Sequence, residues 1–303
     1  MEMNNSLTTQ EVLKWASYFL MKEASQYQLE FNQKDVRRWV ELLVQDKMGW
    51  TRTDLILNSQ EHFDQLTKEN LSKDLEQLAT GMPIQYVIGK ENFWGRDFVV
   101  TPATLIPRPE TEELVQMALD YLTSLDRGRV LEIGVGSGCI GLTLAIEAPQ
   151  LKYLATDISG EALQVAQQNL EQFSLRNVQL LNSDVWDSIP AGTKFDCIIS
   201  NPPYIADNEK KYMDASVLSF EPNQALFAED DGLAIYKRIA SRLEEFLVGS
   251  GMAFFEIGFQ QGSAVKAIFE AVVFCRTVTV IKDMSGLDRM ICISQRSQNV
   301  KVL

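Results

Sequence analysis

The most restrictive feature of this sequence is an alternation of strand-like and helix-like segments that begins near Glu110 and continues to the end of the chain. Apolar runs typical of buried strands occur at Arg129–Ile133, Leu151–Thr156, Asn177–Asn182, Phe195–Ser200, Gly251–Ile257, Val272–Ile281 and Arg289–Ile293. Segments with helical spacing occur at 111–124, from Cys139 onwards, and at Gly160–Phe173, Leu233–Leu247 and Ser263–Glu270. This alternation predicts an α/β fold, a mostly parallel sheet with helices on both faces. The last two strands have only a short link, so at least one should run antiparallel.

The first part of the chain has a different pattern, which predicts a small all-α bundle. Thr8 and Glu11 have the spacing of a capping box ahead of an amphipathic helix. Shorter helices are expected near 53–60 and at Ser72–Ala79. The period changes from Pro83 to Thr104, where ENFWGRDFVV has the pattern of two short extended pieces with a bend near Gly95 and Asp97. We therefore expect a helical bundle at 1–82, a β-hairpin linker at 83–107 and the α/β domain at 108–303.

The charge of the chain bears on its partners. It has 28 basic and 41 acidic residues, which gives a formal net charge of −13. Up to Thr80 there are 9 basic and 13 acidic residues, which leaves 19 and 28 after it. Proteins that bind nucleic acid through its phosphates usually have a basic face, so we expect a protein or small-molecule partner instead. No apolar run is long enough for a membrane span and no signal peptide is visible, so we expect a cytoplasmic protein.

The positions of the cysteines and the presence of a single histidine argue against a metal site and against histidine-dependent catalysis. Cys139, Cys197, Cys275 and Cys292 are far apart in the sequence and lie among apolar neighbours. We expect reduced, buried thiols and no metal site. With only His62 in the chain, a Ser-His-Asp or Cys-His mechanism is not expected either.

A glycine-rich turn joins the first strand of the alternating region to the helix that follows it, in the sequence RVLEIGVGSGCIG. Gly134, Gly136 and Gly138 allow positive φ and let a ligand approach the backbone closely. The next helix offers free N–H groups to a carboxylate or phosphate. Residues 136–141 also fit the dinucleotide pattern GxGxxG, so the turn alone leaves the ligand open.

Two acids follow the next two strands. Asp157 ends the second strand, where a carboxylate can accept hydrogen bonds from both hydroxyls of a ribose, as in sites for NAD and for S-adenosyl-L-methionine. Asp184 follows the third strand, where it can meet the edge of an adenine, and this placement favours S-adenosyl-L-methionine. A structural turn with solvated acids remains the alternative.

The sequence FDCIISNPPYI delivers Asn201, Pro202, Pro203 and Tyr204 to the same edge of the sheet. The two prolines fix φ and remove two N–H donors, so they leave a stiff turn with free carbonyl groups. Together with the Asn201 oxygen and the flat ring of Tyr204, this turn suits a planar NH₂ group. In-line attack of that nitrogen on the sulfonium methyl of S-adenosyl-L-methionine then needs mainly positioning and electrostatics.

The chain resembles the protein-(glutamine-N5) methyltransferases that modify the Gly-Gly-Gln loop of class 1 peptide chain release factors in translation termination. The resemblance covers most of the chain and includes GMPIQYVIGKENFWG (81–95), TPATLIPRPETEELV (101–115), EIGVGSG (132–138), ATDIS around Asp157, SDVW (183–186), SNPPYI (200–205) and FEPNQALFAEDDGL (220–233). The NPPY tetrapeptide is shared with adenine and guanine N-methyltransferases, whereas the PRPETE segment is more specific to this family.

The resemblance implies a five-helix N-terminal domain and a Rossmann-like, seven-stranded class I methyltransferase domain. It implies S-adenosyl-L-methionine as methyl donor, S-adenosyl-L-homocysteine as product, and a class 1 release factor as protein substrate. The residues that would bind the cofactor are Gly134, Val135, Gly136, Ser137, Gly138, Asp157, Asp184, Val185 and Asn201. The residues that would bind the substrate glutamine are Asn201, Pro202, Pro203 and Tyr204, with Asn201, Pro202 and Tyr204 as the catalytic set.

The resemblance further implies that Phe98, Arg108 and Glu110 shape the pocket. Val185 stands where related sequences often have an aromatic residue, so either Val185 or Trp186 is expected to pack on the adenine. Because the α/β domain already supplies the cofactor pocket, the helical bundle is the candidate for binding the release factor. We expect a monomer.

Two other functions remain compatible with parts of the sequence. The first is an N-methyltransferase that acts on adenine or guanine in RNA or DNA, which NPPY permits but the acidic charge disfavours. The second is an NAD-dependent enzyme or a scaffold without catalytic activity, although no residue is evident that would serve as the acid in hydride transfer.

Overall fold

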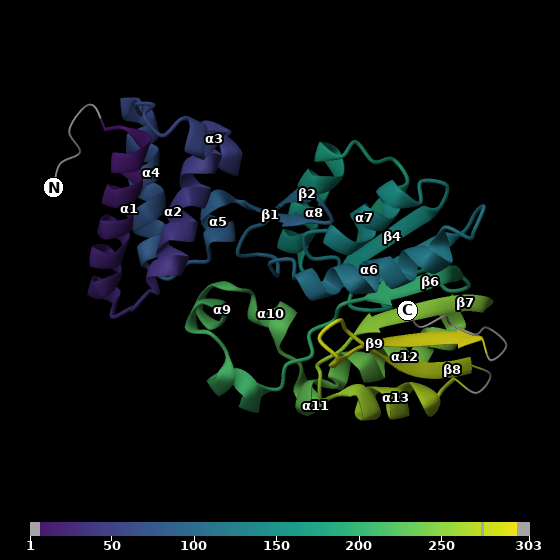
Figure 1. Ribbon diagram of the computed structural model, residues 1–303. Coiled ribbons are helices and arrows are strands. Elements are labelled where there is room, and N and C mark those ends of the chain that lie inside the picture. Colours follow the sequence, from purple (N-terminus) through teal and green to yellow (C-terminus); the bar gives the residue numbers. More distant parts are fainter. Residues whose placement is uncertain (1–6, 274–275, 296–303) are drawn as a thin grey trace. The chain divides into compact units, whose positions relative to one another are not determined.

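The computed structural model describes residues 7–273 and 276–295, and the chain divides into two compact units (Figure 1). The helical unit comprises Met1–Gly89, described from Leu7 onwards, together with Asp214–Phe220. The sheet unit comprises Lys90–Met213 and Glu221–Leu303, described up to Gln295 apart from 274–275.

The helical unit is a bundle whose core lies between its longer helices. Its elements are α1 (Thr9–Ala24), η1 (Ser25–Tyr27), α2 (Gln33–Met48), α3 (Arg52–Leu57), α4 (Gln65–Ala79), α5 (Ile84–Ile88) and α9 (Ala215–Phe220). Val12, Leu20, Val40, Leu43 and Leu71 are among its fully buried side chains. Their helical spacing places them on the inner faces of α1, α2 and α4, which confirms the predicted helical region.

The N-terminal caps of α1 and α4 explain why the predicted start of one helix is confirmed and that of the other is wrong. The capping box is confirmed, because Thr8 N donates to Glu11 Oε2 at 2.8 Å and Glu11 N donates to Thr8 Oγ1. Helix α4 starts at Gln65, well before the predicted Ser72, because the Asp64 side chain caps it by accepting from Thr67 N.

No helix was predicted between Pro83 and the hairpin, but the structure has one there. Residues 84–88 form α5, which has Pro83 at its N-cap and ends at Gly89 with φ +82°. The hairpin follows, with β1 (Lys90–Phe93) paired antiparallel to β2 (Arg96–Val99). The turn between the strands needs positive φ at both Trp94 and Gly95.

The sheet unit is built around a seven-stranded sheet with the order β5-β4-β3-β6-β7-β9-β8. Its strands are β3 (Arg129–Ile133), β4 (Lys152–Asp157), β5 (Val178–Asn182), β6 (Phe195–Ser200), β7 (Leu247–Glu256), β8 (Arg276–Lys282) and β9 (Asp288–Gln295). All neighbouring pairs from β5 to β7 are parallel, and β9 runs antiparallel to both β7 and β8. The expectation that one of the last two strands is antiparallel is therefore confirmed.

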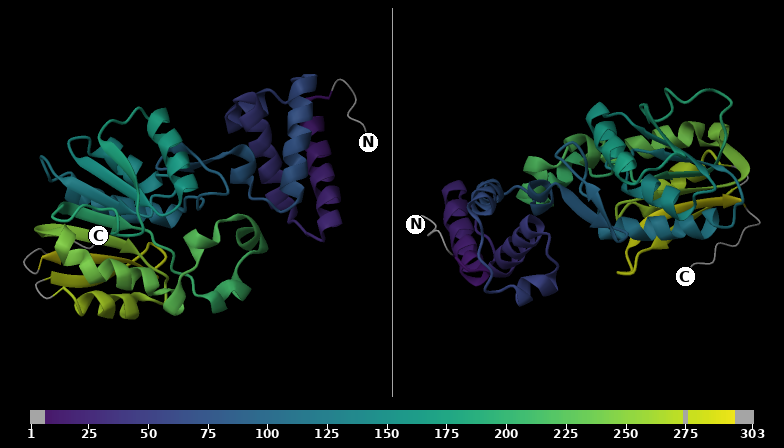
Figure 2. Two further views of the ribbon diagram at one scale, coloured as in Figure 1. Left: turned by 180° about the vertical axis from the view of Figure 1, so that it is seen from behind. Right: turned by 90° about the horizontal axis from the view of Figure 1, so that it is seen from above.

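Helices cover both faces of this sheet, as the views in Figure 2 show. They are α6 (Pro109–Leu122), α7 (Cys139–Glu147), α8 (Gly160–Gln172), α12 (Ala234–Phe246) and α13 (Gly262–Glu270). Side chains that alternate along the strands separate two cores: Cys197, Ile199 and Phe254 pack with α6 and α7, whereas Ile198 and Phe255 pack with α12 and α13.

The chain order of the strands creates the binding edge. From β3, the chain proceeds outwards to β4 and β5, and then crosses back to β6 on the other side of β3. In such doubly wound sheets, ligands bind at the carboxyl ends of the strands where the order reverses.

Beyond the NPPY turn, no helix or strand was predicted between β6 and α12. Outside the helical unit it contains η2 (Asp207–Tyr212), α10 (Asn223–Leu226) and α11 (Glu229–Gly232). Strand β7 also starts earlier than predicted, and residues 274–275 of the predicted strand Val272–Ile281 lie outside the described residues.

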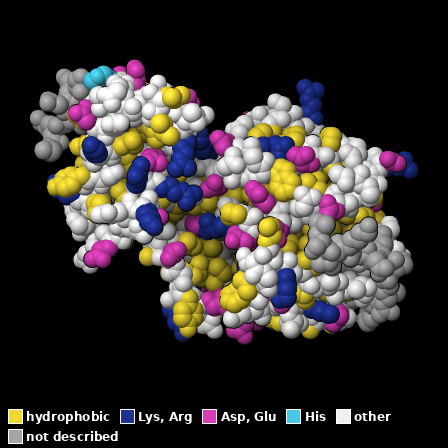
Figure 3. Space-filling model, viewed as in Figure 1, with side chains coloured by type: hydrophobic (Ala, Val, Ile, Leu, Met, Phe, Trp, Pro, Cys, Tyr) yellow, Lys and Arg dark blue, Asp and Glu magenta, His cyan; other side chains and the backbone are white. Residues whose placement is uncertain are grey.

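On the face shown in Figure 3, Lys and Arg side chains are interspersed with Asp and Glu side chains. Within the described part of the chain, no helix combines the length and the apolar character that crossing a membrane requires.

Candidate active site

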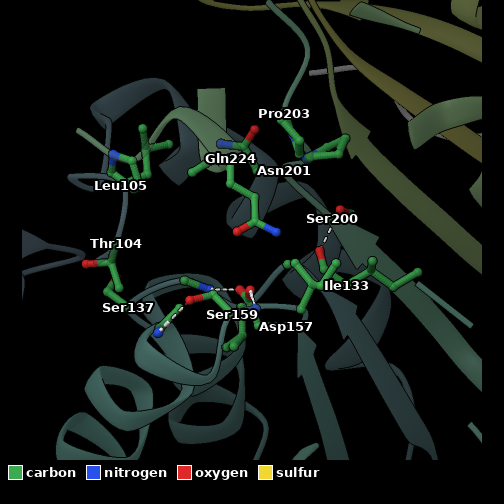
Figure 4. Close-up of a pocket in the computed structure, with 18 of the residues that line it drawn as sticks. Thr104, Leu105, Ile133, Ser137, Asp157, Ser159, Ser200, Asn201, Pro203 and Gln224 are labelled. Atoms are coloured by element: carbon green, nitrogen blue, oxygen red, sulfur yellow. Dashed lines mark hydrogen bonds between the residues drawn. The ribbon is translucent and has the colours of Figure 1, made fainter. Parts of the chain in front are cut away.

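A cavity of about 280 Å³ opens at the carboxyl ends of β3, β4, β5 and β6. The site residues expected from the sequence that line it are Gly134, Val135, Gly136, Ser137, Asp157, Asp184, Val185, Asn201, Pro202 and Pro203. Gly138 and Tyr204 belong to the same two turns but are not among the lining residues. Figure 4 shows Ser137 and Asp157 on one side of the cavity and Asn201 and Pro203 on the other.

The glycine turn is held by the backbone of β4. Gly134 N and Val135 N both donate to Thr156 O at 2.8 Å, and Gly136 N donates to Asp157 Oδ2 at 2.9 Å. Gly134 has φ +77° and Gly136 has φ +53°, a region that other residues enter only with strain. The sequence folds this way because glycine allows the chain to reverse tightly between β3 and α7.

Asp157 occupies the end of β4 and faces the cavity. Its Oδ1 accepts a hydrogen bond from Ser159 N at 2.9 Å, and its Oδ2 accepts from Gly136 N. Burial raises the pKa of this carboxyl above its ordinary value, although the backbone hydrogen bonds oppose the shift. A carboxylate keeps further lone pairs after these two bonds, so Asp157 can still accept from ligand hydroxyl groups.

One buried polar atom at the cavity has no partner among the described residues. Ser137 is 2% exposed, and no hydrogen bond reaches its Oγ. It lies next to the start of α7, whose first N–H groups have no acceptors inside the helix. An unpaired buried hydroxyl, free helix N–H groups and an acceptor carboxylate together fit a ligand with a polar amino acid end and a ribose.

The far end of the cavity is bordered by Asp184, Val185 and Arg238. Arg238 Nη1 forms an ion pair with Asp184 Oδ1 at 2.8 Å, which fixes the carboxylate at the rim. Trp186 does not replace Val185 at the cavity, because its ring is stacked on Phe246 in the core with a centroid distance of 4.6 Å. Of the two candidates for the adenine contact, the structure therefore places Val185 at the cavity.

The NPPY turn leaves β6 directly at the cavity. Asn201, Pro202 and Pro203 line it, and Asn201 Nδ2 donates to Thr111 Oγ1 at 3.3 Å. Tyr204 is not among the residues that line the cavity, and its hydroxyl donates to Glu256 Oε1 at 3.3 Å. Burial raises the pKa of the Tyr204 hydroxyl, and the neighbouring Glu256 adds to the shift.

The three residues that the resemblance associated with pocket shape lie in different places. Arg108 lines the cavity and forms an ion pair with Glu221. Phe98 does not reach the cavity: it is fully buried in the core, edge to face with Phe93 and Phe173. Glu110 is not among the lining residues.

Sequence reasoning missed several residues of the site. Thr111 and Arg238 line the cavity, as does Gln224 of α10, and Glu256 stands behind Thr111. Thr111 lies inside the PRPETE segment, and Glu256 ends a hydrophobic strand just as Asp157 does. A search for polar residues at every strand end would have found Glu256, whereas Gln224 and Arg238 carry no comparable signal.

Of the described cysteines, Cys139 lines the cavity, whereas Cys197 and Cys292 do not. Cys139 is half-buried, Cys197 and Cys292 are buried, and all three are free thiols. Burial raises the pKa of Cys139 and of Cys292 to about 12. Cys275 lies outside the described residues. Within 7–273 and 276–295, no group of three or more His, Cys, Asp or Glu side chains has the arrangement of a metal site.

The parallel sheet, the glycine turn, the acid that ends the second strand and the NPPY turn define a class I S-adenosyl-L-methionine-dependent methyltransferase. Among solved structures, the catalytic domain of hMettl16 in complex with the MAT2A 3′UTR hairpin 1 has the same fold, with a TM-score of 0.55 at 19% identity. That match covers 76% of this chain and 83% of the other.

Two family models match the sequence: the PrmC N-terminal domain over residues 11–89 and the methyltransferase small domain over residues 112–229. The release factor glutamine methyltransferase of Enterococcus faecalis is 38% identical, over 92% of this chain and 96% of that protein. The corresponding enzyme of Bacillus subtilis is 38% identical over 93% and 96%, and that of Lactococcus lactis is 41% identical over 84% and 91%. The chain therefore belongs to the family of release factor glutamine methyltransferases, as the resemblance implied, and S-adenosyl-L-methionine is its cofactor.

Proposed function

We propose that this protein methylates the side-chain amide nitrogen, N5, of the glutamine in the Gly-Gly-Gln loop of class 1 peptide chain release factors. The observation that carries this proposal is the position of the NPPY turn, because Asn201 and Pro202 face the same cavity as the glycine turn and Asp157. An amide group bound at the NPPY turn would therefore lie close to the cofactor's methyl group.

Ser137 and Asp157, which Figure 4 shows on one side of the cavity, help to hold the cofactor in this proposal. Ser137 and the start of α7 bind its amino acid end, and Asp157 accepts from the ribose hydroxyls. Asp184 and Val185 border the adenine. When bound, S-adenosyl-L-methionine supplies a methyl group on a positively charged sulfur.

The NPPY turn prepares the nucleophile. An amide nitrogen is a poor nucleophile because its lone pair is delocalised into the carbonyl group. Asn201 Oδ1 accepts one amide hydrogen and the Pro202 carbonyl oxygen accepts the other, so electron density on the nitrogen rises and its direction is fixed. Tyr204 is proposed to stack on the amide plane, with its hydroxyl anchored on Glu256.

We further propose that the helical unit binds the release factor, that the protein acts as a monomer, and that it works in the cytoplasm. The sheet unit already contains the complete cofactor cavity, which leaves the helical unit available for the protein substrate. Hydrogen–deuterium exchange of the full chain with and without release factor tests this role. We expect protection within residues 7–89, and unchanged exchange there would contradict it.

The deciding experiment uses S-adenosyl-L-methionine labelled at the methyl carbon. The full-length protein is incubated with purified class 1 release factor in one reaction and with total RNA or DNA in others. We expect one labelled methyl group on the glutamine of the Gly-Gly-Gln peptide by mass spectrometry. Label in nucleic acid, with none in the release factor, would show that the amide-binding turn accepts a nucleobase instead.

A further inference from the structure

A chain of hydrogen bonds leads from the substrate side of the cavity into the core. Asn201 Nδ2 donates to Thr111 Oγ1 at 3.3 Å, and Thr111 Oγ1 donates to Glu256 Oε2 at 2.7 Å. Thr111 is 2% exposed and lies in the first turn of α6, while Glu256 is 2% exposed at the end of β7. The chain thus joins three elements that are far apart in sequence.

The direction of these hydrogen bonds follows from the chemistry of the groups. A carboxylate can only accept, so the single hydroxyl hydrogen of Thr111 is committed to Glu256. The lone pairs of Thr111 Oγ1 can then only receive a hydrogen from Asn201, which selects the NH₂ end of the Asn201 amide. The carbonyl end, Oδ1, is left for the cavity.

Glu256 is also held by other hydrogen bonds. Its second oxygen, Oε1, accepts from the Tyr204 hydroxyl at 3.3 Å, and the backbone oxygen of Glu256 accepts from the Tyr236 hydroxyl at 2.6 Å. Burial raises the pKa of Glu256 above its ordinary value, although the hydrogen bond from Thr111, the charge of Arg289 and the hydrogen bond from Tyr204 oppose the shift. Glu256 is therefore linked to both ends of the NPPY turn: to Asn201 through Thr111, and to Tyr204 by a direct hydrogen bond.

We propose that Thr111 and Glu256 are positioning residues that fix the orientation of the Asn201 amide, so that Oδ1 faces the substrate glutamine. This inference rests on the proposed function, because it explains how the NPPY turn can accept both amide hydrogens of the substrate. It also gives the PRPETE segment a role in the site, because Thr111 is its threonine. If Asn201 turned over, its NH₂ group would meet the substrate NH₂ group, and two donors would face each other.

The test compares Thr111→Val with Thr143→Val in the full-length protein. Both threonines are buried, but Thr143 Oγ1 has no partner among the described residues and lies in α7 away from the cavity lining. Each change replaces a hydroxyl with a methyl group of similar size. Steady-state rates with release factor and the dissociation constant for S-adenosyl-L-homocysteine are measured for both variants and for Thr111→Ser.

We expect Thr111→Val to lower kcat about 10- to 100-fold and to leave the S-adenosyl-L-homocysteine affinity within about 2-fold. Thr111→Ser restores the hydroxyl and should return kcat to within about 3-fold of the unmodified protein, and Thr143→Val should match it. Glu256→Gln should lower kcat in the same range, and the double variant Thr111→Val/Glu256→Gln should be no slower than the slower single variant, because both act through Asn201.

The inference is overturned if Thr111→Val keeps its kcat, if its loss appears only in cofactor affinity, or if Thr111→Ser is as slow as Thr111→Val. Thermal unfolding identifies a variant that does not fold. If Glu256→Gln is such a variant, the two Thr111 variants alone decide. An unmodified protein that fails to methylate release factor would instead contradict the proposed function, which keeps the two failures distinct.

Discussion

The two sides of the cavity are built by different means. The cofactor side consists mainly of backbone. The glycine turn donates two backbone hydrogen bonds to Thr156 O, and a single side chain, Asp157, accepts a third from it. The substrate side depends on side chains, because Asn201 is held through Thr111 and Glu256. A backbone-built site is specified by local sequence, whereas a side-chain network is specified only when distant elements pack together.

This difference also predicts where each side is vulnerable. The cofactor side should lose affinity when its carboxylate or its tight packing is changed. The substrate side should lose turnover, because an amide group that points the wrong way still leaves the cofactor cavity intact. The following predictions separate these two outcomes, beginning with the largest effect.

Removal of the Asn201 side chain should have the largest effect. Asn201→Ala removes an acceptor for the substrate amide, so we expect kcat to fall about 100- to 1,000-fold. Cofactor affinity should fall far less, by no more than about 10-fold, because Asn201 is only one of the expected cofactor contacts and the glycine turn and Asp157 are untouched. Single-turnover methylation of release factor and calorimetric titration with S-adenosyl-L-homocysteine measure the two quantities. Near-normal turnover in this variant would contradict the proposed amide binding by the NPPY turn.

The reverse outcome is expected on the cofactor side. Asp157→Asn keeps the shape of the side chain but removes the charge that strengthens its hydrogen bonds to ribose hydroxyls. We expect the dissociation constant for S-adenosyl-L-homocysteine to rise about 10- to 100-fold. At saturating cofactor, kcat and the KM for release factor should change by less than about 3-fold. Unchanged cofactor affinity would mean that Asp157 serves only to hold the Gly136 turn.

The packing beneath the glycine turn should be sensitive to a single methyl group. A Cβ added at Gly141 in α7 would collide with Glu132 Oε2, a buried carboxylate on β3. Gly141→Ala should therefore lower the free energy of unfolding by about 1–3 kcal/mol. Gly160→Ala at the start of α8 is the matched control, because a Cβ there meets nothing within 4 Å. Equal denaturant midpoints for the two variants would show that β3 and α7 can move apart.

The smallest effect should appear in the pH dependence of cofactor binding. Burial raises the pKa of Asp157 from its ordinary 3.8, so its protonation begins closer to neutral pH. The protonated group is a weaker acceptor, and we expect the S-adenosyl-L-homocysteine dissociation constant to rise a few-fold from about pH 7.5 to about pH 5. Asp157→Asn does not titrate and should give a flat profile.

Protonation of Asp157 at low pH should not unfold the protein, so unfolding caused by this residue cannot explain a loss of cofactor affinity. A carboxyl group whose pKa is raised in the folded state binds its proton more tightly there than in the unfolded chain, so this group makes the fold more stable as the pH falls towards that pKa. Thermal unfolding at each pH serves as the control. A wild-type profile as flat as that of Asp157→Asn would contradict a raised pKa at this site.

Much of the sheet unit could be predicted from sequence. Strands β3 and β6 have the predicted bounds, because both are short apolar runs, the first ending in the glycine turn and the second in the NPPY turn. Predictions were wrong where a cap acted outside the hydrophobic pattern. The Asp64 cap starts α4 early, and Pro83 and Gly89 enclose the short helix α5. The short helices between β6 and α12 have too few residues for a readable period.

The residues that tertiary packing supplies to the site escaped prediction. Trp186 was a candidate for the adenine contact, yet its ring stacks on Phe246 and leaves Val185 at the cavity. That Trp186 is aromatic does not predict which way its side chain points, because the packing of the turn after β5 against α12 decides which of the two neighbours faces the cavity. Gln224 likewise reaches the cavity only because the segment around Ile205 pairs with Phe227.

The sequence by itself determined the α/β fold, the glycine turn, Asp157 and the NPPY turn, because each depends on local rules: strand period, positive φ at glycine and fixed φ at proline. Only the tertiary structure decided which end of the Asn201 amide faces the cavity. That choice depends on Thr111 and Glu256, which the sequence separates from each other by 145 positions. A hydrogen bond between such distant residues exists only after α6, β6 and β7 have packed, and local sequence carries no record of it.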